Sequence, residues 1–298
     1  MLNPVFRKDM RVLFRNIKVY IGLAVYLFVL LGVTNLILKM ININNYNGFN
    51  PEYIMIAYLV MFGFQMLTLT FIIPAVTASS ISGERERQTL DFLLVTRMSG
   101  WDIVVGKLMS SLLLVGLLIV ASMPVYAILF YYGGVSVSGF ILNTVFLLIY
   151  SCFVGSIAVF FSTIIKKTAA ATAVSNLFII GITIGTGIAV LIIVGFYNTL
   201  LGAGTLSQSW SRVVGALCII ICSTNPVVCF ISVVDSQVGS NVLWTVINDL
   251  IETDFSFQYL QVWHFIAVIY IILSVLLLKL SARNILPVKR KKQGKHTG

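Results

Sequence analysis

The chain has 298 residues, of which 59% are apolar and only 10% are charged, and its net charge is +10. A soluble globular domain normally has about a quarter charged residues, so this composition excludes that class and indicates a membrane protein. The basic excess is better explained by membrane topology and attraction to anionic lipid than by nucleic-acid binding.

Residues 1–18 are predicted to form an amphipathic helix that lies in the membrane interface. Asn3 suits the N-cap and Pro4 the first helical position. At about 100° per residue the side chains divide into neighbouring apolar and basic arcs. The apolar arc holds Phe6, Met10, Leu13, Phe14 and Ile17, and the basic arc holds Arg7, Lys8, Arg11, Arg15 and Lys18. An unstructured basic flank is the alternative.

Residues 19–281 are predicted to form a transmembrane domain of six helices, because a helix needs about 20 apolar residues to cross the hydrocarbon core. The apolar runs are Val19–Leu38, Tyr53–Ala78, Ile103–Phe130, Phe140–Ile165, Ala169–Tyr197 and Val262–Leu280. We therefore expect an all-α polytopic membrane fold.

A further apolar stretch, Val213–Val234, is interrupted around Asn225 and Pro226, where Asn can cap a helix and Pro can begin one. Each half is too short to cross, so we expect a re-entrant or interfacial hairpin on the outer face, within about residues 205–240. Both termini then lie on one side. All basic residues except Lys39 and Arg212 fall on that side, which the positive-inside rule identifies as cytoplasmic. Residues 282–298 become a basic cytoplasmic tail.

A charged segment, about residues 82–98, separates the second and third spans and is too long for a tight turn. Good helix formers run from Glu84 to Leu94, and Glu84 and Glu86 would suit the first turn of a helix. Ser99 followed by Asp102 resembles a capping box that starts the next span. The segment is therefore predicted to be a cytoplasmic helix with one apolar face, and a solvated loop is the alternative.

Neither a catalytic site nor a metal site is predicted. The segment from Gly100 to Leu108 superficially resembles a phosphate-binding loop, but it has five residues between its glycines and Leu after Lys107. Lys107 is instead expected at the cytoplasmic mouth of the third span. The cysteines at 152, 218, 222 and 229 match no zinc pattern.

The run SGERERQTLDFLLVTRMSGWDIVVGKL, which begins at Ser82, resembles the signature segment of the ABC type-2 exporter permeases. The matching positions are Ser82–Arg87, Thr89–Asp91, Leu93, Leu94, Thr96, Ser99, Ile103, Gly106 and Lys107. Gln88 stands where that family often has Gly, and Arg97 where it often has Pro, which leaves the local helix boundaries open. The N-terminal helix, six spans and outer hairpin are also similar to that family's plan.

The resemblance implies a permease subunit of the cell membrane that is not itself an ATPase and that exports a substrate. A separate ABC ATP-binding subunit would hold ATP and magnesium, and this chain would hold no cofactor. The permease would pair with a second copy or a homologous permease. The residues expected to couple to the ATPase are Glu84, Arg85, Glu86, Arg87, Thr89, Leu90, Asp91, Phe92, Leu93 and Leu94, with Lys166 and Lys167 as weaker candidates.

Polar side chains within the spans are the candidates for a transport path: Gln65, Asn143, Ser175 and Asn176. Ordinary hydrogen bonding between helices is the alternative. Gly181, Gly185 and Gly187 would allow another helix to approach the fifth span closely. A secondary transporter or channel-like protein without an ATPase is the alternative function, but it would usually need ionisable groups deep in the spans. The sequence does not indicate the substrate.

Overall fold

The computed structural model describes residues 4–44, 51–89, 99–131, 136–202, 213, 217, 220–238 and 262–285. Every regular element in these ranges is an α-helix, which confirms the all-α fold. The helices are α1 (Pro4–Arg15), α2 (Ile17–Asn44), α3 (Pro51–Thr77), α4 (Ser79–Glu86), α6 (Gly100–Tyr131), α7 (Val137–Ile164), α8 (Thr168–Gly202), α10 (Pro226–Val238) and α12 (Val262–Ile285).

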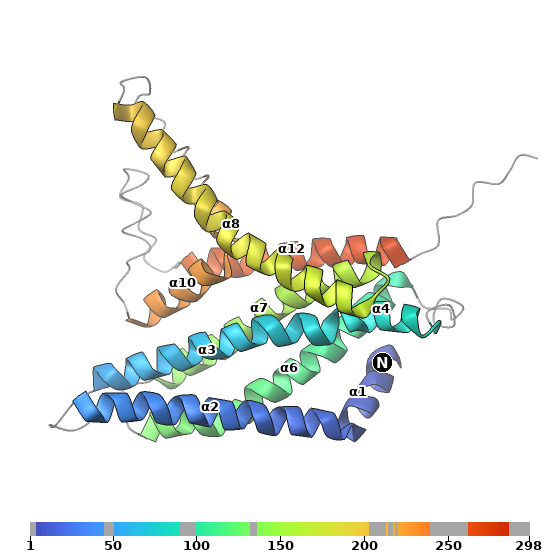
Figure 1. Cartoon of the computed structure of the whole chain (residues 1–298), viewed down its shortest axis with the longest axis horizontal. Helices are drawn as coiled ribbons and strands as arrows, with labels where there is room; N and C mark the ends of the chain where they lie inside the picture. Colours follow the sequence, from blue (N-terminus) through green and yellow to red (C-terminus); the bar gives the residue numbers. More distant parts are fainter. Residues whose placement is uncertain are drawn as a thin grey trace, which may run out of the picture.

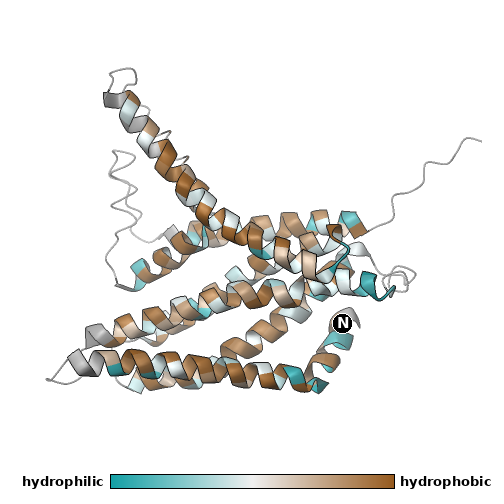
Figure 2. Ribbon diagram, viewed as in Figure 1, coloured by the Kyte–Doolittle hydropathy of each residue, from teal (hydrophilic) through white to brown (hydrophobic). Residues whose placement is uncertain are grey.

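Six runs among the described residues are long and apolar enough to cross a membrane, which confirms the six predicted spans. They correspond to α2, α3 continued by α4, α6, α7, α8 and α12, whereas α10 is shorter. Apolar residues cover most of each long helix, and hydrophilic ones gather near the end that carries α1 and α4 (Figure 2). The C-terminal end of α12 lies at the same end (Figure 1).

The centre of the helix bundle is α7, which packs against α3, α6, α8 and α12. Tyr150 and Tyr270 are fully buried, and the rings of Phe153 and Tyr270 stack with centroids 4.2 Å apart. In the apolar stretch of α7 that would cross the membrane, 61% of the residues are buried inside the protein, whereas in the corresponding stretch of α8 only 6% are. Accordingly, α8 diverges from the other helices along much of its length (Figure 1).

Glycine at 155 allows α7 to lie close to α6. A Cβ atom added at Gly155 would lie 2.7 Å from Cδ1 of Leu108, nearer than real Cβ contacts. By contrast, no described residue lies within 4 Å of a Cβ added at Gly181, Gly185 or Gly187. Among the described residues, no other helix therefore approaches closely at these three glycines.

The N-terminal helix begins at Pro4 as predicted, but it ends at Arg15 rather than continuing to Lys18. Asn16 interrupts it, because the Asn16 Oδ1 atom accepts a hydrogen bond from the Lys18 backbone N–H at 3.0 Å and so caps the next helix. The predicted cap, Asn3, lies outside the described residues. The amphipathic segment and the first span are thus separate helices, α1 and α2.

The predicted break in the outer apolar stretch is confirmed. Residues 223–225 are not helical, and α10 begins at Pro226 with Asn225 Oδ1 accepting from the Val227 backbone N–H at 2.8 Å. The Asn225 amide also donates to the Thr183 carbonyl at 3.1 Å and the Thr186 hydroxyl at 2.8 Å, both on α8. Most of the remaining predicted hairpin lies outside the described residues.

The close packing at Gly155 leads to a stability prediction. Gly155→Val is expected to lower the free energy of unfolding by about 1–3 kcal/mol, because its side chain must displace Leu108. Gly116→Val on α6 is the matched control, since a Cβ added there meets nothing within 4 Å. Thermal unfolding of the purified protein in detergent measures both. Equal effects at the two positions would contradict the packing argument.

Candidate functional site

The charged segment after the second span begins with a tightly closed helix end. Gln88 has φ 56°, in the left-handed region. The Thr89 backbone N–H donates to the Glu84 carbonyl at 2.8 Å, and that of Gln88 donates to the Arg85 carbonyl at 3.1 Å. This is the hydrogen-bond pattern of a Schellman cap, whose left-handed position favours Gly. Position 88, where this chain has Gln instead of the Gly that is common in the family, is therefore the one that takes the left-handed conformation favoured by Gly.

This helix end corrects one prediction. Glu84 and Glu86 were expected in the first turn of a new helix, but they lie in the last turn of α4, which continues from the second span after a short break at Ala78. The helix dipole disfavours carboxylates at this end, so each needs a partner of its own. Leu90, Asp91, Phe92, Leu93 and Leu94 lie outside the described residues, and a helix there stays a prediction.

The start of the third span confirms the predicted capping box. The Ser99 hydroxyl donates to Asp102 Oδ2 at 2.6 Å and accepts from the Asp102 backbone N–H at 3.2 Å. The Ser99 backbone N–H also donates to Asp102 Oδ2, at 3.2 Å. Two free donors at the beginning of α6 are thus satisfied reciprocally.

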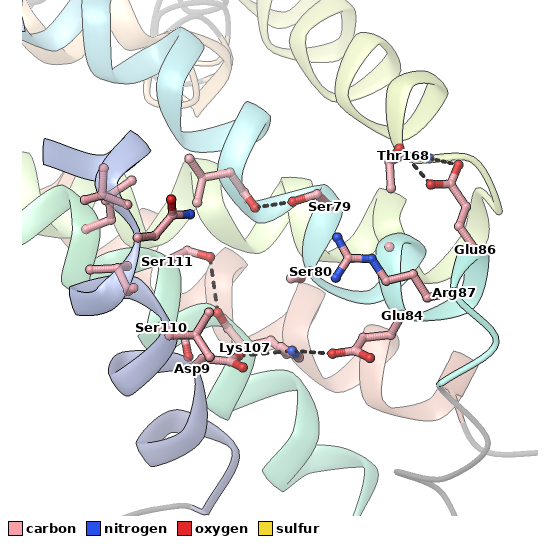
Figure 3. A pocket seen from close by; sticks show the side chains of 17 residues that line it. Asp9, Ser79, Ser80, Glu84, Glu86, Arg87, Lys107, Ser110, Ser111 and Thr168 are labelled. Atoms are coloured by element: carbon pink, nitrogen blue, oxygen red, sulfur yellow. Dashed lines mark hydrogen bonds and ion pairs between the residues drawn. The ribbon is translucent and has the colours of Figure 1, made fainter. Parts of the chain in front are cut away.

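Lys107 links three helices at this end of the molecule. Its ammonium group lies 3.0 Å from Asp9 Oδ2 on α1 and 3.1 Å from Glu84 Oε1 on α4 (Figure 3). Only 7% of the Lys107 side chain is exposed. A buried ammonium is costly unless it is paired and hydrogen-bonded. The two carboxylates therefore hold α1 and α4 against α6.

The next two charges of α4 bind the link between α7 and α8. Arg85 Nη2 donates to the Thr163 carbonyl at 3.1 Å, in the last turn of α7. Glu86 accepts from the Thr168 backbone N–H at 2.9 Å and from its hydroxyl at 3.0 Å, at the first residue of α8 (Figure 3). Each charge has the sign that its helix end favours. The α4 tip is therefore joined to α6, α7 and α8.

These contacts bring the two predicted coupling segments together. The α7–α8 link contains Lys166 and Lys167, which are both exposed, as are Arg87 and Gln88 at the end of α4. Because Glu86 is bonded to Thr168, the two segments are neighbours. Glu84 and Arg85 instead point their charges into the protein, where they bind other helices. We call the four exposed residues 87, 88, 166 and 167 the tip surface.

Two of the four candidate transport-path residues lie in separate hydrogen-bonded clusters that line the same small cavity. Gln65 is buried and binds Tyr126 Oη at 2.5 Å and Ser122 Oγ at 3.1 Å. Asn143 is also buried and binds Tyr58 and Gln237, each at 2.5 Å. Both line a cavity of about 10 Å³, which has room for about one water molecule. The two clusters tie the helices together, and the cavity between these described residues is small.

The other two candidates lie on α8. The hydroxyl of Ser175 donates to the Ala171 carbonyl of its own helix at 2.7 Å. Asn176 Oδ1 is buried and has no hydrogen-bond partner among the described residues. Neither residue lines the cavity that Gln65 and Asn143 share. Among the described residues, the four candidates therefore do not line one shared cavity.

The pairing of Asp9 with Lys107 was not predicted. Asp9 is the one acidic residue among the first eighteen, and Lys107 is the one charged residue in the apolar run Ile103–Phe130. Each is unusual for its surroundings, because a charge that breaks a local pattern often has a specific partner. Their separation of 98 positions leaves the identity of that partner to the fold.

The ion pairs of Lys107 lead to a second prediction. Lys107→Met is expected to destabilise the protein by about 1–3 kcal/mol, because two neighbouring carboxylates lose their counter-ion. Adding Asp9→Asn and Glu84→Gln is expected to recover most of that loss. Lys18→Met, at an exposed position, is the control for lost charge. If the triple variant unfolds as easily as Lys107→Met, the electrostatic account is wrong.

The left-handed residue at 88 leads to a third prediction. Gln88→Gly is expected to stabilise the protein by about 1 kcal/mol, since a non-glycine residue pays about that much in this region. Gln88→Val, whose branched Cβ fits it poorly, should destabilise. Denaturant unfolding in mild detergent compares both with the unmodified chain. A destabilising effect of Gly would contradict the proposed cap.

Comparison with known protein families agrees with this architecture. The sequence model of the family described as "ABC-2 family transporter protein" matches residues 4–279, from the start of α1 into the last turns of α12. A search of curated proteins finds no match. Since the family match covers most of the chain, including all six long apolar helices, the protein belongs to the ABC-2 family of transporters and is a multi-pass membrane component of an ABC transporter.

Proposed function

We propose that the protein is the permease subunit of an ABC exporter and that it receives force from a separate ATP-binding subunit at the tip surface. The observation that supports this most strongly is the bonding of α4 to three other helices through Glu84, Arg85 and Glu86. A displacement of this end of α4 would therefore be transmitted to α6, α7 and α8 together. ATP and magnesium belong to the partner subunit in this proposal.

The tip surface has the chemistry of a contact with an acidic partner. Arg87, Lys166 and Lys167 are exposed and basic, and their neighbours on α4 are occupied by internal bonds. Exposed charges of one sign speed the encounter with a surface of opposite sign and help to orient it. We propose that these residues dock the ATPase together with Thr89 and residues 90–94, while Glu84, Arg85 and Glu86 connect the docked tip to the spans.

The transport step is proposed to be a rigid-body movement. When ATP closes the ATPase pair, the docked tip would shift, and the second and third spans would reorient with it. A second permease copy or a homologous permease would cover α8, whose apolar surface is largely exposed and whose three glycines leave room for another helix. A path past Gln65 and Asn143 would then open only after the hydrogen bonds of each residue rearrange.

The orientation and outer region complete the proposal. The end with α1, α4 and Lys107 would face the cytoplasm, since α1, the end of α4, the α7–α8 link and the end of α12 carry most of the basic residues that the structure describes. The turn at Asn225 is bonded to the middle of α8, and Gln237 of α10 bonds to Gly139 and Asn143 of α7. These contacts support an outer hairpin that re-enters the bundle. Residues 1–18, 19–281 and 282–298 would be the interfacial helix, membrane domain and cytoplasmic tail.

Reversing charge on the tip surface tests the coupling proposal. The variant Arg87→Glu combined with Lys166→Glu is expected to reduce the ATPase that co-purifies with the tagged permease by at least about 10-fold, because two favourable charge contacts become repulsive. Mass spectrometry after gentle extraction from the native membrane identifies and quantifies the ATPase.

Two comparisons make this result interpretable. Lys39→Glu reverses a charge near the far end of α2 and should leave ATPase recovery unchanged. Thermal unfolding of each variant shows whether lost recovery comes from misfolding. If the unmodified protein brings down no ATPase, or if the tip variant recovers as much as Lys39→Glu, coupling at this surface is wrong and transport without an ATPase gains support.

A further inference from the structure

A cavity of about 580 Å³ opens beside the Lys107 ion pairs, between α1, α4 and α6 (Figure 3). Its volume lies in the range of sites that bind small molecules. Its lining includes apolar side chains, with Leu13 from α1, Val19 from α2 and Leu114 from α6, as well as polar and charged ones. A cavity with both kinds of side chain suits an amphiphile with an apolar chain and a polar headgroup.

The carboxylates at the cavity already have partners. Glu84 accepts from Lys107 through one oxygen and from Thr89 through the other. Glu86 uses both oxygens to accept from Thr168. Asp9 accepts from Lys107 through one oxygen and keeps the other without a described partner. Nearly all the acidic acceptors are therefore occupied.

By contrast, two hydrogen-bond donors at the cavity lack an acceptor among the described residues. The Ser80 hydroxyl is buried and has no hydrogen-bond partner among the described residues. The guanidinium of Arg87 makes no ion pair with another described residue, and it turns back over α4 toward Ser80 (Figure 3). Both residues line the cavity. The buried Ser80 hydroxyl lacks a partner and the exposed Arg87 guanidinium lacks a counter-ion among the described residues, so the cavity suits a ligand that supplies acceptor atoms.

We propose that this cavity binds the phosphate headgroup of a membrane lipid, with an acyl chain along its apolar wall. Arg87 would pair with the phosphate and Ser80 would donate to it, and a guanidinium with phosphate is among the strongest such pairs. The second carboxylate oxygen of Asp9 would accept a hydrogen bond from an amine on the same headgroup. The cavity lies beside the amphipathic helix α1, at the end of the spans, where lipid headgroups are expected. The inference does not depend on ATPase coupling.

Binding of three small probes to the purified permease in detergent tests the proposal. Dihexanoyl phosphatidic acid carries both phosphate and short chains, glycerol phosphate carries only the phosphate, and dihexanoylglycerol only the chains. Titration calorimetry should show binding of the first probe at least about 10-fold tighter than that of either other. Glycerol phosphate that binds as tightly as phosphatidic acid would mean a site for soluble phosphate and would overturn the lipid assignment.

Variants locate the site. Arg87→Gln is expected to weaken phosphatidic acid binding by about 10-fold or more, and Ser80→Ala by a smaller factor. Arg283→Gln, an exposed basic residue in the last turn of α12, is the matched control and should not change affinity. If Arg87→Gln and Arg283→Gln weaken phosphatidic acid binding equally, the effect comes from general surface charge, and the proposal is overturned.

Filling the cavity with a larger side chain tests the proposal without changing any charge. Leu114→Trp places a large side chain against the apolar wall and should abolish phosphatidic acid binding, while the thermal unfolding of the unliganded protein stays within a few degrees. Retained binding in this variant would show that the lipid sits elsewhere. No ATPase is present in these measurements, so their outcome is separate from the coupling test.

Discussion

A single buried ammonium group organises the end of the protein where α1, α4 and α6 meet. Lys107 has given up most of its contact with water, and two carboxylates from distant parts of the chain compensate it. The helix dipole disfavours a carboxylate at the C-terminal end of α4, and the ion pair with Lys107 compensates for this at Glu84. Conversely, burial of the Lys107 ammonium group would be costly without the two carboxylates. Each group makes the position of the others possible.

The rest of the α4 tip follows from the same constraint. With Glu84 held by Lys107, the next two side chains reach the end of α7 and the beginning of α8, where Arg85 meets a free carbonyl and Glu86 meets a free N–H. One short charged run thereby satisfies helix ends of both signs. Glu84 and Glu86, which were expected to begin a separate cytoplasmic helix, instead lie at the bonded end of the second span. The exposed surface beside them includes residues 87, 88, 166 and 167.

Features set by nearby residues could be predicted from the sequence. The capping box at Ser99 and Asp102, and the start of α10 at Pro226, each depend on residues within one turn of helix. The six spans follow from length and apolarity alone. What could not be predicted were pairs far apart in the chain, such as Asp9 with Lys107 and Glu86 with Thr168. Composition and periodicity carry no information on which helices lie side by side, and charges near a membrane surface usually report only topology.

We propose that the tip of α4 and the start of α8 move as one body during the ATPase cycle. Disulfide trapping tests it directly, because a Cβ added at Gly83 would lie 3.6 Å from Thr168 Cγ2. Gly83→Cys with Thr168→Cys, in a chain whose native cysteines are replaced by alanine, should cross-link, and the rate of ATP-driven transport by the complex should be the same before and after reduction. Transport that stops when the cross-link forms and returns on reduction would mean that the two segments must separate, and it would contradict the account.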